Sequence, residues 1–296
     1  MKERIIVIVL LFMVNFCAKT QVNENIFLMK LGTDKVYLLS EGQRDGSASI
    51  LIGADSVITE KYAPNNSFPM ATNAFLWQTG GKNILFDTGY GKELFNNLKS
   101  LQIKPEDINV ICITHMHGDH FGGLLLDNKV AFPKAELYVS QAEYDYWTSE
   151  ETMNQAPENM RGGFVAAKKV LEAYKDHLHL FEPNAFDSKI YKELCFGILA
   201  LSIPGHTPGH TAYLVGSGKD RLLIWGDLTH AMAVQMPHPE IAVSYDTNTE
   251  LAVKSRLSVL QWVSKRAIPI AGMHIPYPGI GTIEESDPGY RFIPAK

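Results

Sequence analysis

The feature that most constrains this chain is a run of metal-ligating side chains directly after a buried strand. Residues 110–114 are apolar and β-forming, and the letters HMHGDH follow them without a break. Alternate residues at a strand end project the same way, so His115 and His117 converge on one point. Asp119 and His120 lie where the chain turns, and they face a second point. Zinc accepts imidazole and carboxylate ligands, and iron or manganese tolerates them, so the run predicts a metal site.

Three further ligand-type residues each stand at the end of an apolar run. They are His206, Asp227 and His274, which follow the runs 198–203, 222–225 and 267–271. Functional side chains gather at such positions because a rigid scaffold holds them in place. Each of the three alone has an ordinary structural explanation. Together with the first run they supply enough ligands for two coordination shells.

Short apolar runs bounded by turn residues recur along the chain and alternate with stretches of helical periodicity. We expect strands at 74–77, 83–86, 110–113, 136–139, 212–215 and 222–225. We expect helices at 92–101, 141–148, 163–175 and 250–265, the last with an apolar face of Leu251, Leu257, Leu260 and Val263. This order predicts an α/β sandwich with mixed sheets, and we expect residues 21–296 to form a single domain.

The first residues indicate export. Lys2 and Arg4 precede the apolar run 5–14, which is shorter than the roughly 18 residues of a membrane span. We therefore expect residues 1–20 to be a signal peptide and the protein to be periplasmic or secreted, with no membrane span. Lipidation of Cys17 is the alternative, but the preceding phenylalanine is bulky where a lipidation signal prefers a small residue.

Charge and residue context limit the other interpretations. The formal net charge is −5 and there is no long basic run, so we expect no nucleic-acid partner. Cys112 and Cys195 each lie in an apolar run, which indicates buried free thiols, and a disulfide in an oxidising compartment is the alternative. His177 and His179 have the spacing of metal ligands but stand without partners at the end of a polar helix. We expect them to be solvated surface histidines.

The ligand pattern gives the chain a resemblance to a known family. The pattern H-x-H-x-D-H followed by single His, Asp and His residues, with Phe86–Gly89 before it, resembles the metallo-β-lactamase fold superfamily over residues 70–296. The resemblance implies a four-layer αβ/βα sandwich with two mixed β-sheets and a site at one edge of both. It also implies two Zn²⁺ ions per chain, with Fe, Mn or Co as alternatives, and it favours a homodimer.

The resemblance further implies a role for each candidate. One ion would lie on His115, His117 and His206, and the other on Asp119, His120 and His274, with Asp227 bridging. Asp87 would orient a ligand histidine, and His210 would support the site from behind the ligands. We expect Asp119 and His230 to be the catalytic residues. His230 stands where some family lactonases carry a substrate-contacting tyrosine, and it would hydrogen-bond or protonate the leaving group; a satisfied buried histidine is the alternative.

Within the superfamily, the chain is similar to the branch that holds methyl parathion hydrolase and the N-acyl homoserine lactonases. The similarity lies in residues 225–230, 233–235, 271–281 and 289–292. It implies a dinuclear zinc hydrolase that opens lactone or ester bonds by a metal-bridging hydroxide. An N-acyl homoserine lactonase active in quorum quenching is the first expectation, and an organophosphate triester hydrolase is the alternative. The expected partner is therefore a small-molecule lactone, ester or phosphotriester.

Other functions fit less well. A β-lactamase of this family would carry Cys or Ser where Asp227 stands, and a non-catalytic metal-binding protein would lack one of the ligand candidates, all of which are present. An acyl or aryl arm of the substrate would need an apolar pocket. The candidates for its lining are Phe68, Met70, Tyr144, Tyr146, Trp147, Met232, Met236 and Tyr277.

Overall fold

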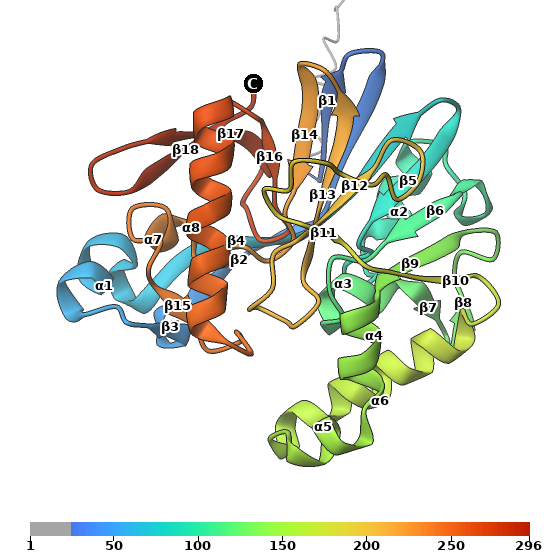
Figure 1. The fold of residues 1–296 in the computed structure, drawn as a ribbon, viewed down its shortest axis with the longest axis horizontal. Helices are drawn as coiled ribbons and strands as arrows, with labels where there is room; N and C mark the ends of the chain where they lie inside the picture. Colours follow the sequence, from blue (N-terminus) through green and yellow to red (C-terminus); the bar gives the residue numbers. More distant parts are fainter. Residues whose placement is uncertain (1–24) are drawn as a thin grey trace, which may run out of the picture.

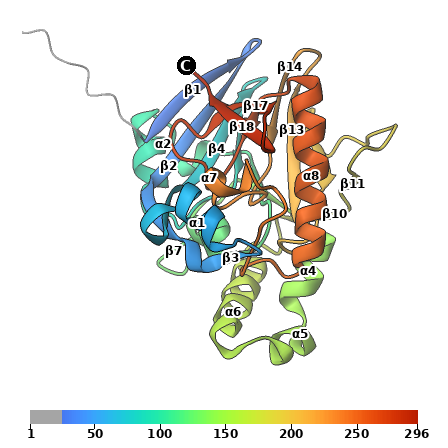
Figure 2. The ribbon, with the colours of Figure 1, turned by 90° about the vertical axis from the view of Figure 1, so that its left-hand side faces the viewer.

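Two seven-stranded sheets form the centre of the molecule (Figures 1 and 2). The structure, a computed structural model, describes residues 25–296, so the expected signal peptide at 1–20 lies outside the described residues. The first sheet holds β1 (Ile26–Leu31), β2 (Asp34–Ser47), β4 (Ser67–Thr79), β5 (Lys82–Phe86), β6 (Val110–Cys112), β9 (Glu136–Ser140) and β10 (Leu178–Phe181). The second holds β11 (Asn184–Ala185), β12 (Leu199–Ser202), β13 (Thr211–Ser217), β14 (Asp220–Ile224), β16 (Ile270–Ala271), β17 (Ile280–Glu285) and β18 (Tyr290–Pro294).

Both sheets are mixed. In the first, β1, β2, β4 and β5 pair antiparallel, whereas β5, β6, β9 and β10 pair in parallel. In the second, the parallel pairs are β11 with β12 and β14 with β16, and the other neighbours are antiparallel. Two short ribbons lie outside these sheets: β3 (Leu51–Ile52) with β15 (Ala242–Val243), and β7 (Leu125–Leu126) with β8 (Lys129–Val130).

Helices cover the outer faces of the sheets. The α-helices are α1 (Ser56–Tyr62), α2 (Leu94–Ser100), α3 (Gly118–Phe121), α4 (Gln141–Thr148), α5 (Glu150–Gln155), α6 (Glu158–Ala173), α7 (Met232–Gln235) and α8 (Thr249–Arg266). Short 3-10 turns occur at Ala48–Ile50, Pro64–Asn66, Pro105–Asp107 and Gly122–Leu124. Among the described residues, no helix is long and apolar enough to cross a membrane.

Three apolar clusters define four layers. Between the sheets, residues such as Phe75 and Phe86 pack against residues such as Tyr213 and Ile224. On the far side of the first sheet, a second cluster joins that sheet to α2, α4 and α6. On the far side of the second sheet, a third cluster includes the apolar side of α8, which runs along that face in Figure 1. The predicted four-layer αβ/βα sandwich with two mixed sheets is confirmed.

The expected elements are found, with differences at helix ends and faces. All six expected strands fall within observed strands or extend them by one residue, and the helix expected at 141–148 is α4. Helix α6 begins at Glu158, earlier than expected, and Gly162 and Gly163 lie inside it. Glycine weakens a helix by about 1 kcal/mol relative to alanine, and apolar packing of the helix outweighs this cost here.

The predicted apolar face of α8 was partly wrong. Leu260 and Val263 are buried, but Leu257 is 41% exposed and Arg256 is buried beside it. Helix α8 is therefore rotated so that an arginine, rather than a leucine, points toward the body of the molecule. The guanidinium of Arg256 turns inward because it hydrogen-bonds to backbone carbonyl oxygens there.

Candidate metal centre

The ligand candidates meet at one edge of the two sheets because each lies in a segment that follows a strand. His115 and His117 follow β6, and Asp119 and His120 lie in the single turn of α3. His206, Asp227 and His274 follow β12, β14 and β16 of the second sheet. Segments from both halves of the sandwich thus contribute to one site, as the sequence predicts. The residues that could hold a metal ion form three groups, which are His115, His117, His206 and Asp227; Asp119, His120 and His274; and Asp227, His230 and His274.

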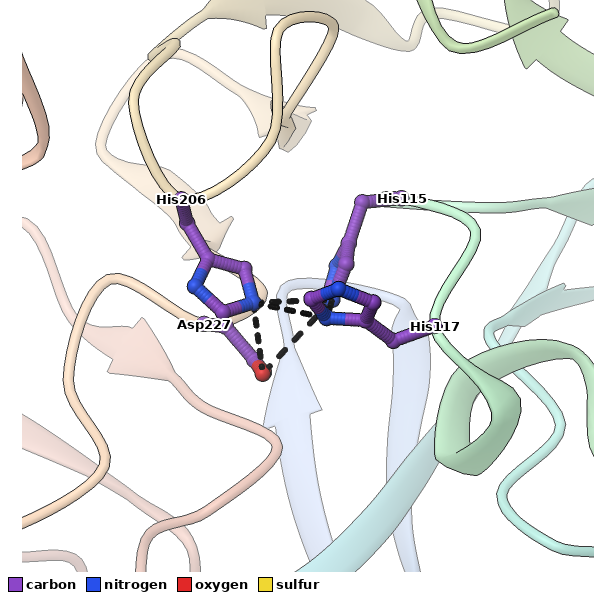
Figure 3. A group of neighbouring side chains, drawn as sticks. All are labelled: His115, His117, His206 and Asp227. Carbon is purple, nitrogen blue, oxygen red and sulfur yellow. Dashed lines mark hydrogen bonds and ion pairs between the residues drawn. The ribbon is translucent and has the colours of Figure 1, made fainter. Parts of the chain in front are cut away.

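The first group contains three imidazoles, which lie together with Asp227 in Figure 3. His115 Nε2 lies 3.0 Å from His117 Nδ1, and His206 Nε2 lies 3.2 Å and 3.0 Å from these two atoms. Four-coordinate zinc with bonds of about 2.0–2.1 Å separates its ligand atoms by about 3.3 Å in a tetrahedron. The three nitrogens converge at nearly this spacing, so they fit three corners of a zinc shell.

The second group consists of Asp119, His120 and His274. His120 Nε2 lies 3.6 Å from Asp119 Oδ1, and His274 Nε2 lies 3.5 Å from Asp119 Oδ2. His120 and His274 are buried, whereas the side chain of Asp119 is 17% exposed. This group therefore has one ligand candidate that reaches towards solvent.

Asp227 lies between the two groups. Its Oδ2 is 3.4 Å from His206 Nε2 and 3.0 Å from His274 Nε2, while its Oδ1 is 3.2 Å from His120 Nε2. Burial would raise the pKa of this carboxyl, but the surrounding histidines, His120 and His274 foremost, hold it well below its usual range. Asp227 is therefore a buried carboxylate that contacts both groups, the arrangement that a bridging ligand needs.

Two buried polar atoms that face each other in the site lack a hydrogen bond. His120 Nε2 and Asp227 Oδ1 are both fully buried and make none. Buried polar groups in native proteins are nearly always satisfied, and a cation between these atoms would satisfy both. The described residues thus fit one or two metal ions by donor chemistry, by spacing and by unsatisfied ligand atoms.

The protonation of the histidines differs between the groups. Burial lowers the pKa of His115 and His206 well below the usual value and that of His117 to about 4, so these three rings are neutral at pH 7. Burial also acts on His120 and His274, but the nearby carboxylates, Asp227 first among them, raise the pKa of both. A cation at the second group would therefore replace protons.

Outer residues fix the orientation of the candidate ligands. Asp87 Oδ2 lies 2.7 Å from His120 Nδ1 and accepts a hydrogen bond from the Thr114 hydroxyl, which in turn lies 3.1 Å from His115 Nδ1. His274 Nδ1 donates to the carbonyl oxygen of Ala71 at 2.8 Å. Such partners hold each imidazole with its other nitrogen towards the metal. The contact between Asp87 and a ligand-candidate histidine is the one the sequence predicts.

Asp246 was missed at the sequence level. Its Oδ1 lies 2.9 Å from His206 Nδ1, and its Oδ2 accepts a hydrogen bond from the backbone of Val243. It therefore orients His206 as Asp87 orients His120. Asp246 stands in a polar stretch just before the N-cap of α8, where an aspartate has an ordinary role as a turn or capping residue. No motif marks it.

His210 lies behind the ligand candidates. The backbone amide of Asp227 donates to its Nε2 at 3.0 Å, and burial lowers the pKa of His210 to about 3. A neutral ring is required for this contact, because a protonated imidazole has no acceptor. His210 thus supports the backbone of Asp227, in line with the position expected for it.

His230 lies beside Asp227 and is not a fully satisfied buried histidine. Its Nε2 is 3.0 Å from Asp227 Oδ2, and its ring stacks on His274 with centroids 4.8 Å apart. Its Nδ1 is buried and has no hydrogen-bond partner. This unpaired nitrogen counts against a fully satisfied core histidine, and it leaves His230 with a free polar atom next to the candidate metal centre.

A cavity of about 880 Å³ opens onto the site. Asp119, Asp227, His230 and His274 line its floor, and its walls include Met70, Tyr90, Met160 and Tyr245. Of the eight residues expected to line such a pocket, only Met70 does so. Met232, Met236 and Tyr277 line a separate apolar groove, and Phe68, Tyr146 and Trp147 belong to core clusters.

The pair His177 and His179 is exposed, as expected, but it has a partner. His179 Nε2 lies 2.6 Å from Glu136 Oε2, and His177 Nδ1 lies 3.3 Å from Glu136 Oε1. His179 belongs to strand β10 rather than to the end of a helix. The expectation that these histidines are unpaired was therefore wrong, because β9 brings Glu136 alongside β10.

The predicted free thiols are found, with Cys112 buried and Cys195 half-buried.

Comparisons with known proteins agree with this geometry. A family model for the metallo-beta-lactamase superfamily matches residues 68–267. The chain is similar to the solved structure of AidC, a dizinc quorum-quenching lactonase in complex with a homoserine product. The TM-score is 0.81 at 28% identity, over 92% of this chain and 98% of that one. The hydrolase AbOPH, of the beta lactamase superfamily, gives the same TM-score and coverage at 26% identity.

Curated relatives match shorter stretches. A probable metallo-hydrolase of Mycobacterium bovis is 30% identical over 190 residues, which cover 55% of this chain and 58% of that protein. A ribonuclease of Thermus thermophilus is 28% identical over 57% of this chain and 38% of its own length. An N-acyl homoserine lactonase of Bacillus cereus is 25% identical over 57% of this chain and 68% of its own. The chain thus spans less than two thirds of the length of the first two relatives.

Proposed function

Because the chain belongs to the metallo-beta-lactamase superfamily, we propose that it is a metal-dependent hydrolase that opens N-acyl homoserine lactones with two zinc ions bound. The position of Asp227 carries the proposal. Its Oδ1 faces His120 and its Oδ2 faces His206, so one carboxylate contacts both groups of candidate ligands. The likeness to AidC over nearly the whole chain supports a lactone as the substrate.

The two ions would be held by the groups described above. His115, His117 and His206 would hold one, and Asp119, His120 and His274 the other, with Asp227 between them. When bound, the ions would lower the pKa of a coordinated water towards neutrality and would polarise the carbonyl of the substrate. The protein itself fixes the spacing of the ligands and keeps the imidazoles of the first group neutral.

Opening a lactone requires a proton at the leaving oxygen. Water adds to the acyl carbon and the bond from this carbon to the ring oxygen breaks, so the acyl side becomes a carboxylate, the leaving oxygen takes up a proton to become an alcohol, and the second proton of the water is released to solvent. We assign this proton transfer to His230, whose ring lines the cavity and whose Nε2 lies 3.0 Å from Asp227 Oδ2. Proton transfer from a positioned side chain contributes about 10²–10⁴-fold to the rate.

The cavity suits an uncharged substrate with an apolar arm. Its volume of about 880 Å³ lies in the upper part of the range for small-molecule sites. Methionine and tyrosine side chains, among them Met160 and Tyr245, give one wall an apolar surface. An acyl chain would lie against this wall while the lactone ring faces Asp119 and His230.

A kinetic panel on zinc-loaded protein tests the proposal. It compares homoserine lactones of several acyl lengths with methyl parathion, a cephalosporin, a glutathione thioester and a short RNA. We expect the highest kcat/KM for a homoserine lactone. A higher kcat/KM for methyl parathion would contradict the lactonase proposal and favour the alternative, an organophosphate triester hydrolase. A preference for RNA would contradict the small-molecule assignment as well.

A further inference from the structure

Glu143 is a buried acidic residue that the proposed reaction does not use. It lies in α4, and its side chain is 1% exposed at the base of the candidate metal centre. A buried carboxylate is costly unless hydrogen bonds stabilise it, so its partners indicate its purpose. Burial raises the pKa of the Glu143 carboxyl, and its hydrogen-bond donors oppose that rise.

The two oxygens of Glu143 bind the backbones of two different ligand segments. Oε2 accepts a hydrogen bond from the amide of Met116 at 2.8 Å, and Met116 stands between His115 and His117. Oε1 accepts one from the amide of Gly209 at 2.9 Å, in the turn that holds His206. One carboxylate therefore connects the segment after β6 in the first sheet to the segment after β12 in the second.

The contact at Gly209 is reinforced from the start of the same helix. Ser140, the N-cap of α4, donates its hydroxyl hydrogen to the carbonyl oxygen of Gly209 at 2.9 Å. A Cβ atom at Gly209 would lie 2.4 Å from Ser140 Oγ and 2.5 Å from the backbone nitrogen of Glu143. The approach is so close that only glycine fits at this position, so α4 holds the turn on both sides of the residue.

Trp147 fixes the carboxylate in turn. Its Nε1 donates to Glu143 Oε2 at 2.8 Å, and its ring meets the His117 ring edge-on with centroids 5.5 Å apart. Neutral N–H groups of Met116, Gly209 and Trp147 donate to Glu143, and the side chain of Thr207 also interacts with the carboxylate. These donors fix the orientation of the carboxylate, which cannot rotate without losing a hydrogen bond.

We propose that Glu143 is a positioning residue that sets the spacing of the His115, His117 and His206 imidazoles and thereby the metal affinity of this group. It acts through the backbone and touches no ligand atom. Its contacts with the ligand segments go to the first group, so the second group, with Asp119, His120 and His274, keeps its affinity when Glu143 is changed. The inference rests on the proposed metal binding.

The test compares Glu143→Gln with Asp145→Asn. Asp145 lies on the exposed side of the same helix, so its substitution removes the same charge away from the site. In Glu143→Gln, the new amide group faces at least one N–H donor, whichever way it turns. We expect the variant to release one of two zinc ions at a chelator concentration about 10–100-fold lower than wild type, as for other outer partners of ligands. Asp145→Asn should match wild type.

Metal content and the visible spectrum of the cobalt-loaded protein give the readout without catalysis. Equal affinity for both ions in Glu143→Gln and wild type, even with a lower Tm, would overturn the inference and make Glu143 structural only. If Glu143→Gln does not fold, Trp147→Phe decides, because it removes one donor and keeps both backbone contacts. It should weaken the same ion to a smaller extent, and unchanged affinity would overturn the inference. A wild type that binds no zinc would instead contradict the proposed function.

Discussion

At the scale of single residues, His230 and the ligand candidates differ in how completely their nitrogens are used. His274 donates from Nδ1 to a backbone carbonyl and presents Nε2 to the site. His230 presents Nε2 to Asp227 but leaves Nδ1 buried and unpaired. An unpaired buried nitrogen costs stability, on the order of 1–3 kcal/mol, so function gives a better reason for it than packing does.

We expect His230→Ala to lower kcat by about 10²-fold, because the leaving oxygen would lose its proton donor. Both zinc ions should remain, since neither proposed shell needs this ring. The measurement is steady-state kinetics with metal analysis of the same sample. His179→Ala, a change at an exposed histidine far from Asp227 in the fold, is the control. Loss of both ions from His230→Ala would show that the residue is structural.

Residues whose type and local pattern carry a signal could be predicted, and residues that act through tertiary contacts could not. The run from His115 to His120 predicts a metal site because it holds four ligand-type residues within six positions. In the sequence, Glu143 is an ordinary acidic residue of a polar helix and Asp246 an ordinary turn residue. Their roles could not be predicted because their hydrogen-bond partners lie far away in the sequence. The cavity wall was mispredicted for the same reason: Tyr90, Met160 and Tyr245 belong to segments that no short pattern connects.

At the scale of elements, α8 holds the segment that carries Asp227 and His230. Arg256 is buried in this helix, and its guanidinium donates to the carbonyl oxygens of Leu228, Pro239 and Ile241 at 2.8–2.9 Å. Burial lowers the pKa of this arginine to about 10. These bonds explain the rotation of α8, because the helix must turn Arg256 inward to reach the carbonyls. Periodicity of apolar residues alone could not show this.

We expect Arg256→Met to lower the free energy of unfolding by about 2–6 kcal/mol. It leaves two carbonyl oxygens, those of Leu228 and Pro239, without this donor, at about 1–3 kcal/mol each. The third, Ile241, keeps a bond from Gln235. Urea denaturation of the zinc-free protein measures the change. Lys254→Met on the exposed side of α8 is the control, and equal losses in the two variants would contradict the argument.

At the scale of the whole molecule, the candidate metal centre lies at the edge of the sandwich and joins its two sheets. Residues after β6 supply one part of the ligand set, and residues after β12, β14 and β16 supply the other. Ions bound there would connect the sheets at this edge, where the apolar core between them ends. Because the ions would bind the native state and not the unfolded chain, metal binding would stabilise the whole fold.

Removal of zinc should lower the Tm. A ligand present at 100 times its Kd stabilises a protein by about 2.7 kcal/mol, and each kcal/mol shifts the Tm of a protein of this size by about 2–4 °C. We expect a strong chelator to lower the Tm by at least about 5 °C, and added zinc to restore it. In the double variant Asp119→Ala/His120→Ala the shift should be about half as large. An unchanged wild-type Tm after complete zinc removal would contradict the connection between the sheets.

The proposed metal ligands lie far apart in the sequence, so they are synthesised at different times. The proposed ligands begin at His115, and the last of them, His274, enters near the end of the sequence. A growing polypeptide on the ribosome therefore exposes the histidines of the first sheet long before their counterparts in the second exist. The first shell can close only after synthesis has passed His206 and the bridging Asp227, and the second only after it has passed His274, so neither ion can be fully enclosed before the strands of the second sheet have been made.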